Sequence, residues 1–169
     1  NGRLVRVISG IQPTDAKIMA DYAKEARMDL VVPGHESCLE ADLGDWCRAY
    51  GIPFAGPCSR GARLETSKAF QFQFLMDNGI PSPLGKICET VTSAKAFANM
   101  HWNGVVVKAD GMARGKGVKL CENTEEAYAA IEQLMIHREC GRAGDRLVMQ
   151  EFLRERTEVS LHVITDAAS

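Results

Sequence analysis

Short apolar segments alternate with helical segments through the first third of the chain, and this order constrains the fold more than any other feature. Residues 14–26 and 39–50 repeat apolar side chains at helical spacing. Three short segments are predicted strands because they are apolar and rich in β-branched residues: 3–8, 30–32 and 52–55. The alternating order predicts a parallel sheet covered by helices. Ligands of such sheets bind at the carboxyl ends of the strands, so we expect binding loops at 33–37 and 56–59.

A second unit follows a boundary that we place near residues 60–66, which gives predicted domains at 1–62 and 63–169. Ser67 and Asn123 are the predicted N-caps of two of its helices. The predicted helices are 68–78, 92–100 and 124–137. The predicted strands are 84–88, 105–108, 118–121, 147–151 and 159–164. Helices and strands are less regularly interleaved here than in the first unit.

The composition excludes several classes of protein. Of the 169 residues, 46% are hydrophobic and 25% are charged, which is too apolar for a disordered chain. No apolar run approaches the roughly 18 to 20 residues that a membrane span needs. The formal net charge of -2 argues against bulk binding to nucleic acid. We therefore expect a cytoplasmic protein with no membrane or nucleic-acid partner.

The six cysteines include no Cys-x-x-Cys pair, so neither a zinc site nor a disulfide framework is predicted. We expect reduced thiols, and we assign no metal ligands. The chain begins at Asn1 instead of methionine and ends directly after an apolar strand-like run. The sequence therefore has the character of one piece of a longer protein.

A glycine-rich loop between two predicted strands is the most informative segment. Residues 108–118 read KADGMARGKGV and combine three glycines with three basic side chains. Closely spaced glycines expose backbone N–H groups that can surround phosphate oxygens. The spacing matches neither a P-loop nor the dinucleotide-binding fingerprint. Taken alone, the loop is also compatible with a flexible basic hairpin.

Three further motifs accompany this loop. They are GHESCL at 34–39, LETSKAF at 64–70 and QEFL at 150–153. In this order and at this spacing, the four motifs resemble those of phosphoribosylamine–glycine ligases in the ATP-grasp superfamily, and the resemblance covers essentially the whole chain. It implies an α/β fold in which the end of a parallel-sheet pre-ATP-grasp domain precedes an α+β ATP-grasp nucleotide-binding subdomain.

The resemblance also implies roles for individual residues. Lys68 and Lys108 would hold the nucleotide phosphates, and with Lys116 they are the expected catalytic residues. The loop expected to close over the triphosphate includes Asp110, Gly111, Gly115, Lys116 and Gly117. The strand expected along the adenine comprises Gln150, Glu151, Phe152 and Leu153. Glu158 would bind the ribose hydroxyls, and Glu36 would face the amine substrate.

Some positions depart from the family pattern. Gln150 replaces the usual first glutamate of its strand, and residues 35–38 keep the acid of a Pro-Glu-Ala-Pro loop but lose both prolines. Arg114 stands where a small residue is common. A carboxylate requirement at Gln150 would weaken nucleotide binding, and the loss of both prolines would make the 35–38 loop less rigid.

The implied reaction joins glycine to 5-phosphoribosylamine through a glycyl phosphate in purine biosynthesis. Its implied cofactor is ATP with Mg²⁺ or Mn²⁺, with metal ligands beyond this sequence, so we expect these 169 residues to be inactive alone. The implied protein is a monomer or is fused to other purine-pathway domains. Three alternatives stay open: another ATP-grasp carboxylate–amine ligase, an ATP-grasp carboxylase, or a nucleotide-binding module without chemistry.

Overall fold

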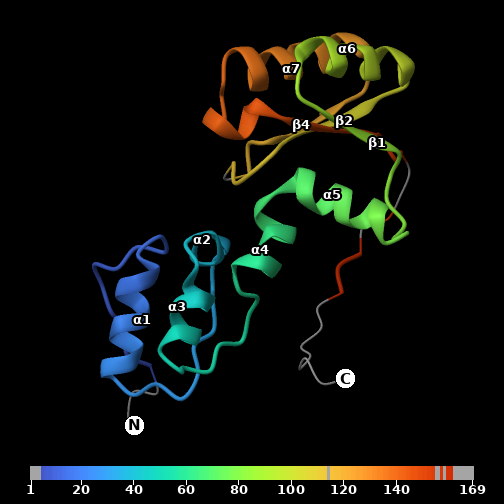
Figure 1. The fold of residues 1–169 in the computed structure, drawn as a ribbon. Helices are drawn as coiled ribbons and strands as arrows, with labels where there is room; N and C mark the ends of the chain where they lie inside the picture. The colour runs from blue at the N-terminus through green and yellow to red at the C-terminus, as the bar shows by residue number, and fades with distance from the viewer. Residues whose placement is uncertain (1–4, 114, 155–156, 158, 162–169) are drawn as a thin grey trace.

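The computed structural model describes residues 5–113, 115–154, 157 and 159–161. Four helices form the first part of the chain: α1 Ala16–Glu25, α2 Glu36–Glu40, α3 Leu43–Ala49 and α4 Ser59–Thr66. The second part holds the strands β1 Gly85–Cys88, β2 Val105–Ala109, β3 Val118–Cys121 and β4 Leu147–Glu151. Its helices are α5 Lys68–Asp77, α6 Val91–Met100 and α7 Thr124–Ile131. Figure 1 shows the two parts joined through α4 and α5.

Within the described residues of the first part, the predicted parallel order is present as one isolated parallel bridge, between Val31 and Phe54. The Val31 N–H donates to the Pro53 carbonyl at 2.9 Å, and the Ala55 N–H donates to the Val31 carbonyl at 2.9 Å. The strand predicted at 3–8 is wrong over its described residues, 5–8, which are exposed and unpaired. A β-strand is stable only when it pairs with a neighbouring strand, and no described segment pairs with residues 5–8.

The helix predicted at 39–50 is two helices. Asp42 lies between them in the left-handed region, with φ of 62°, and this interrupts the helical hydrogen bonding. The first of the two, α2, begins earlier than predicted because His35 caps it: His35 Nδ1 accepts a hydrogen bond from the Ser37 N–H at 3.1 Å. The small core beneath these helices contains Ala16, Ala20, Cys38, Leu43 and Cys47.

Helix α4 was not predicted, and the predicted domain boundary after residue 62 falls inside it. Its sequence, SRGARLET, is polar, and Ala62 is its buried residue. Helix α5 follows after Ser67, whose side chain caps it by accepting from the Phe70 N–H at 3.1 Å, as predicted. The start of α5 is therefore fixed at Lys68.

The second part is built on an antiparallel sheet of order β1-β4-β2-β3. Its four strands match the predicted segments to within one residue at each end. The predicted helix 124–137 is confirmed, except that its last turn, Glu132–Ile136, is a π-helix. A 3₁₀ turn, Gly141–Asp145, leads into β4. Of the last predicted strand, 159–164, the described residues 159–161 are not in a strand, and the others lie outside the described residues.

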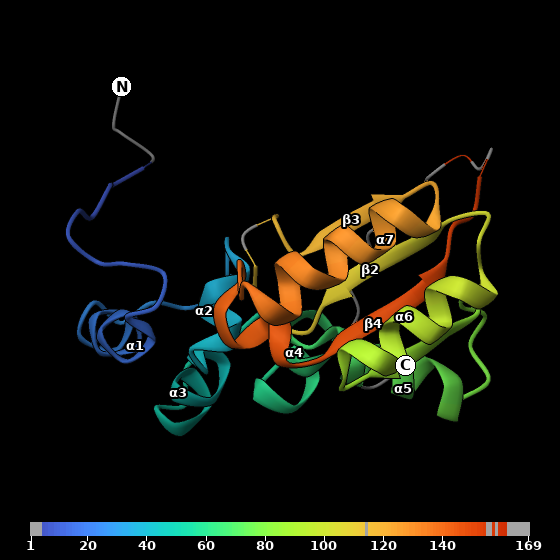
Figure 2. The ribbon, with the colours of Figure 1, turned by 90° about the horizontal axis from the view of Figure 1, so that it is seen from above.

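The sheet buries its two faces unequally. One face packs against α6 and α7, and its largest buried side chains come from β2 and β4: Val105, Val107, Leu147 and Met149. On the other face, Val148 packs with Ala69 and Phe72 of α5. Figures 1 and 2 show α6 and α7 together on one side of the sheet and α5 on the opposite side. Because fewer apolar side chains fill the α5 face, polar side chains such as Lys108 can lie on that face of the sheet.

Candidate functional site

The structure brings Lys68 and Lys108 together on the α5 face of the sheet. Lys108 is paired in register with Val148, so both side chains point to the face that α5 covers. Lys68 is the first residue of α5. Burial lowers the pKa of Lys108, and the nearby positive charge of Lys68 lowers it further. Two cations from distant parts of the sequence therefore lie near each other on this face, and their role as phosphate ligands stays a prediction.

The ammonium groups of both lysines lack an ion-pair partner among the described residues. Lys68 Nζ donates to the carbonyl of Gly111 at 3.3 Å, and this is a neutral acceptor. Two half-buried ammonium groups repel each other, and an anion between them would remove that cost. This arrangement is suited to binding an anion with several negative oxygens, such as a polyphosphate.

The glycine-rich loop connects β2 to β3 beside these lysines. Its base is closed by a 2.7 Å hydrogen bond from the Ala109 N–H to the Gly117 carbonyl. A side chain at Gly117 would place its Cβ 2.5 Å from the Cβ of Ala113, so only glycine fits there. Gly111 and Gly115 have positive φ angles of 119° and 80°, which glycine adopts without strain. The local turns of the loop thus depend on all three predicted glycines.

The charged residues of this loop have different positions. The Lys116 side chain is exposed, and its backbone N–H donates to the Ala113 carbonyl at 2.9 Å. Arg114 lies outside the described residues. Asp110 is different, since its side chain is 9% exposed and both carboxylate oxygens accept hydrogen bonds from protein groups. A direct contact between Lys116 and a nucleotide stays a prediction.

The strand expected along the adenine, Gln150 to Leu153, begins buried and ends exposed. Gln150 is 6% exposed, and its amide donates to the Ser82 hydroxyl at 3.2 Å. Its neighbour Glu151 accepts from the Leu84 N–H at 2.9 Å. Phe152 lies under the guanidinium of Arg154, and Leu153 is exposed. Because Gln150 has a polar partner, the structure accommodates this departure from the family pattern without a buried unpaired amide.

Glu158, the residue expected at the ribose, lies outside the described residues. The same is true of the last part of the predicted strand that follows it.

Glu36 lies where the two parts of the chain face each other. It lines a hollow of about 670 Å³ together with residues of the 12–14 loop and Met112 of the glycine-rich loop. Glu36 Oε2 is 3.6 Å from His35 Nδ1. The other lining residues are Gln12, Pro13, Thr14, His35, Ser37 and Glu40. Glu36 and Met112 of the glycine-rich loop therefore line the same hollow. Lys68 and Lys108 are not among the residues that line it.

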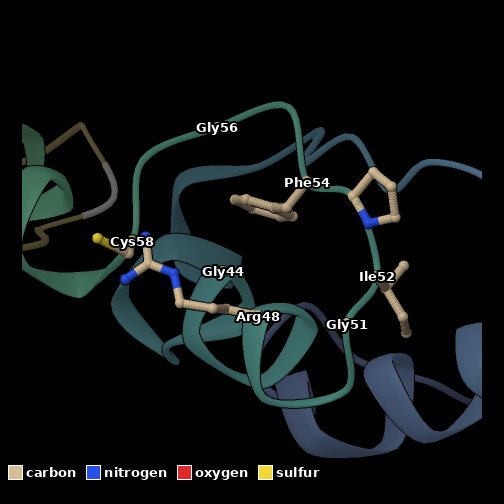
Figure 3. Close-up of a pocket in the computed structure, with 8 residues that line it drawn as sticks. Gly44, Arg48, Gly51, Ile52, Phe54, Gly56 and Cys58 are labelled. Atoms are coloured by element: carbon tan, nitrogen blue, oxygen red, sulfur yellow. The ribbon is translucent and has the colours of Figure 1, made fainter. Parts of the chain in front are cut away.

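The second predicted binding loop, 56–59, lines another hollow, of about 380 Å³ (Figure 3). Figure 3 shows the guanidinium of Arg48 beside the sulfur of Cys58. A hydrogen bond from the Gly61 backbone lowers the pKa of the Cys58 thiol, and Arg48 lowers it further. Four of the other cysteines are buried instead: Cys38, Cys47, Cys88 and Cys121.

Sequence reasoning missed three contributors to these sites. Arg146 binds the Asp110 carboxylate, although nothing in the sequence distinguishes it from a surface arginine. Ser67 was predicted only as a helix cap, yet its hydroxyl also donates to Asp110 at 2.8 Å. Met112 belongs to a recognised motif, but its contact with the Glu36 hollow depends on the tertiary fold.

The described residues contain no group of three or more His, Cys, Asp or Glu side chains that is arranged to hold a metal ion. No helix among them has both the length and the apolar character that crossing a membrane requires.

Comparisons with known proteins agree with the motifs. A relative named phosphoribosylamine–glycine ligase, from Phenylobacterium zucineum, is 40% identical over 146 residues, which is 86% of this chain and 34% of the relative. A bifunctional purine biosynthetic protein of Pichia angusta is 36% identical over 160 residues, 95% of this chain and 20% of that protein. The chain thus spans about a third or less of the length of these two relatives.

A solved structure shares the fold. It is the biotin carboxylase domain of 2-oxoglutarate carboxylase from Hydrogenobacter thermophilus, in complex with MgADP and bicarbonate, with a TM-score of 0.70 and 26% identity over 87% of this chain and 34% of the solved chain. Two sequence models of families match in succession: the phosphoribosylglycinamide synthetase N domain at residues 3–65, and the ATP-grasp (A) domain of the same synthetase at residues 66–169. Together with the paired lysines beside the glycine-rich loop, these matches show that the chain belongs to the phosphoribosylglycinamide synthetase family of ATP-grasp proteins.

Proposed function

We propose that the full-length protein is an ATP-dependent ligase that joins glycine to 5-phosphoribosylamine, giving glycinamide ribonucleotide, ADP and phosphate. The observation that carries this proposal is the pair of cations Lys68 and Lys108 next to the glycine-rich loop, which have no ion-pair partner within the described part of the chain. Their charge suits the triphosphate of ATP. The ligase names of the relatives support the choice of substrates.

The reaction has two steps that this arrangement favours. A carboxylate oxygen of glycine attacks the γ-phosphorus, and ADP leaves with the electrons of the broken P–O bond. The amine nitrogen then attacks the carbonyl carbon of the acyl phosphate, phosphate leaves, and the nitrogen loses a proton. Lys68 and Lys108 would bind the phosphate oxygens. The backbone amides of the glycine-rich loop, together with Lys116, would stabilise the negative charge that develops on the phosphate oxygens during phosphoryl transfer.

Further roles follow for the remaining predicted residues. The backbone of residues 150–153 would bind the adenine, and Glu158 the ribose. Glu36 would bind the phosphoribosylamine, because it lines the hollow that the glycine-rich loop also lines. We further propose that residues 1–62 serve the amine side and 63–169 the nucleotide side. The protein would act in the cytoplasm, as a monomer or fused to other purine-pathway domains.

Magnesium, or manganese in its place, would neutralise phosphate charge in this reaction. The described residues offer no acidic cluster that fits such an ion. The resemblance to phosphoribosylamine–glycine ligases is the ground on which we propose metal ligands elsewhere in the full-length protein, and none of the residues above is assigned to the metal.

The test is turnover by the full-length protein with ATP, glycine and enzymatically generated phosphoribosylamine. We expect ADP release that requires both glycine and the amine, with glycinamide ribonucleotide identified by mass spectrometry. ADP release that requires bicarbonate and no amine would support the carboxylase alternative instead. ATP binding without any turnover would support a module that has no chemistry.

Glu36→Gln tests the substrate assignment separately. We expect a higher KM for phosphoribosylamine and an unchanged affinity for ATP. Glu40→Gln is the matched control, because Glu40 lines the same hollow at the other end of α2. Equal effects of both substitutions would contradict a specific role for Glu36.

A further inference from the structure

Asp110 sits at the meeting point of three segments of the nucleotide site. It directly follows β2, and its backbone N–H donates to the Arg146 carbonyl at 3.1 Å. One carboxylate oxygen accepts from the Ser67 hydroxyl at 2.8 Å and from the Ala69 N–H at 3.1 Å. The other accepts from two nitrogens of the Arg146 guanidinium. One side chain therefore ties β2, the first turn of α5 and the residue before β4 to one another.

The residues tied by Asp110 flank the two lysines. Lys68 lies between Ser67 and Ala69, and Lys108 lies two residues before Asp110 on β2. The two ammonium groups repel each other, and only neighbouring structure can hold them close in the absence of an anion. The hydrogen bonds of Asp110 link the backbone segments that carry the two lysines, and they do so independently of the contact between Lys68 Nζ and the Gly111 carbonyl.

The protonation state of the Asp110 carboxyl agrees with a role as the acceptor that links these segments. Burial alone would raise its pKa, but the hydrogen bonds from Ala69, Ser67 and Arg146 outweigh burial and lower it. The group is therefore a carboxylate at neutral pH, with protein donors on both oxygens. Since Arg146 supplies the balancing charge, the Asp110 carboxylate does not form an ion pair with either lysine in the described structure.

We propose that Asp110 and Arg146 are positioning residues, which hold Lys68 and Lys108 at the separation that a bound triphosphate requires. This inference rests on the proposed function, because it takes the two lysines as the phosphate ligands. It assigns Asp110 an indirect role in place of the direct nucleotide contact predicted from the motif. Arg146 acts on the two lysines through its contact with Asp110.

The test compares ATP with AMP as ligands of the full-length protein. Asp110→Asn replaces one oxygen by an NH₂ group, so the side chain loses its paired acceptor for Arg146 and keeps an acceptor for Ser67 and Ala69. We expect roughly a tenfold loss of ATP affinity, the size of one charge-assisted hydrogen bond, with AMP affinity unchanged within about twofold. Arg146→Lys keeps the charge without the bidentate geometry, and it should give a smaller loss of the same kind.

The matched control is Asp145→Asn, since Asp145 forms an exposed ion pair with Arg138 at 3.2 Å close to the same strand. It should change neither affinity. Equal losses of ATP and AMP affinity in Asp110→Asn and Arg146→Lys would overturn the positioning role and leave a purely structural one. Unchanged ATP affinity in both variants would also overturn it, while the proposed function would stand. A wild-type protein that binds no ATP would overturn both.

Discussion

Lys108→Met should make the free protein more stable and bind ATP more weakly. The Lys108 side chain is half-buried, and burial and the charge of Lys68 both lower its pKa. With a folded-state pKa below the ordinary value of 10.5, the unfolded chain holds this proton more tightly than the folded one. The stability cost is therefore fully present below the lowered pKa, and it fades as the pH rises from the lowered pKa toward 10.5. Methionine has a similar length and no charge, so it removes the cost.

The size of the ATP effect follows from the bond that is lost. A hydrogen bond between charged groups contributes about 1.5 to 3 kcal/mol, and each 1.36 kcal/mol changes an equilibrium constant about tenfold. Lys108→Met should therefore weaken ATP binding by about 10- to 150-fold. Titration calorimetry gives the affinity, and urea unfolding at pH 7 without ligand gives the free energy of unfolding.

Lys86→Met is the matched control for this experiment. Lys86 lies on β1 of the same sheet, where its side chain is exposed and points away from the α5 face. It should alter neither stability nor ATP affinity by a comparable amount. A Lys108→Met protein that is less stable than wild type and binds ATP normally would refute the reasoning, because Lys108 would then be an ordinary structural lysine.

Three further predictions concern other parts of the structure. ATP affinity should fall as the pH rises through the lowered pKa of Lys108. Calorimetry across a pH series should show this fall displaced upward in Lys108→Arg, and an identical profile would contradict the assignment. Gly85→Ala should lower the free energy of unfolding by about 1 to 3 kcal/mol in urea titrations, because the added Cβ would lie 2.7 Å from the Met149 carbonyl oxygen. Iodoacetamide should label Cys58 before Cys47, because the pKa of the Cys58 thiol is lowered while Cys47 is buried and burial raises its pKa. Mass spectrometry that shows the reverse order of labelling would refute this.

The sequence predicted the second part of the fold well because its signals are local. Ser67 and Asn123 cap the helices that follow them, and the β-branched run of β2 pairs on both edges. The strand order could not be read from the sequence, since it depends on which hydrophobic faces meet. The break at Asp42 was missed because an aspartate in the left-handed region gives no pattern in the sequence.

In the candidate site too, some features could be predicted from sequence motifs, and others depend on the tertiary fold. The pairing of Lys68 and Lys108 was accessible from motifs, and the structure places the two charges together. The link through Asp110 was not accessible, because Arg146 lies 36 positions away in the sequence and joins Asp110 only through the pairing of β4 with β2. The same holds for the hollow shared by Glu36 and Met112, which needs both parts of the chain.

The most direct test of the central claim is a crystal structure of the full-length protein with a non-hydrolysable ATP analogue. The phosphate site described above predicts that Nζ of Lys68 and Nζ of Lys108 both lie within about 3.2 Å of phosphate oxygens, with the glycine-rich loop next to the γ-phosphate. An analogue whose phosphates lie elsewhere, with both ammonium groups facing solvent, would contradict it.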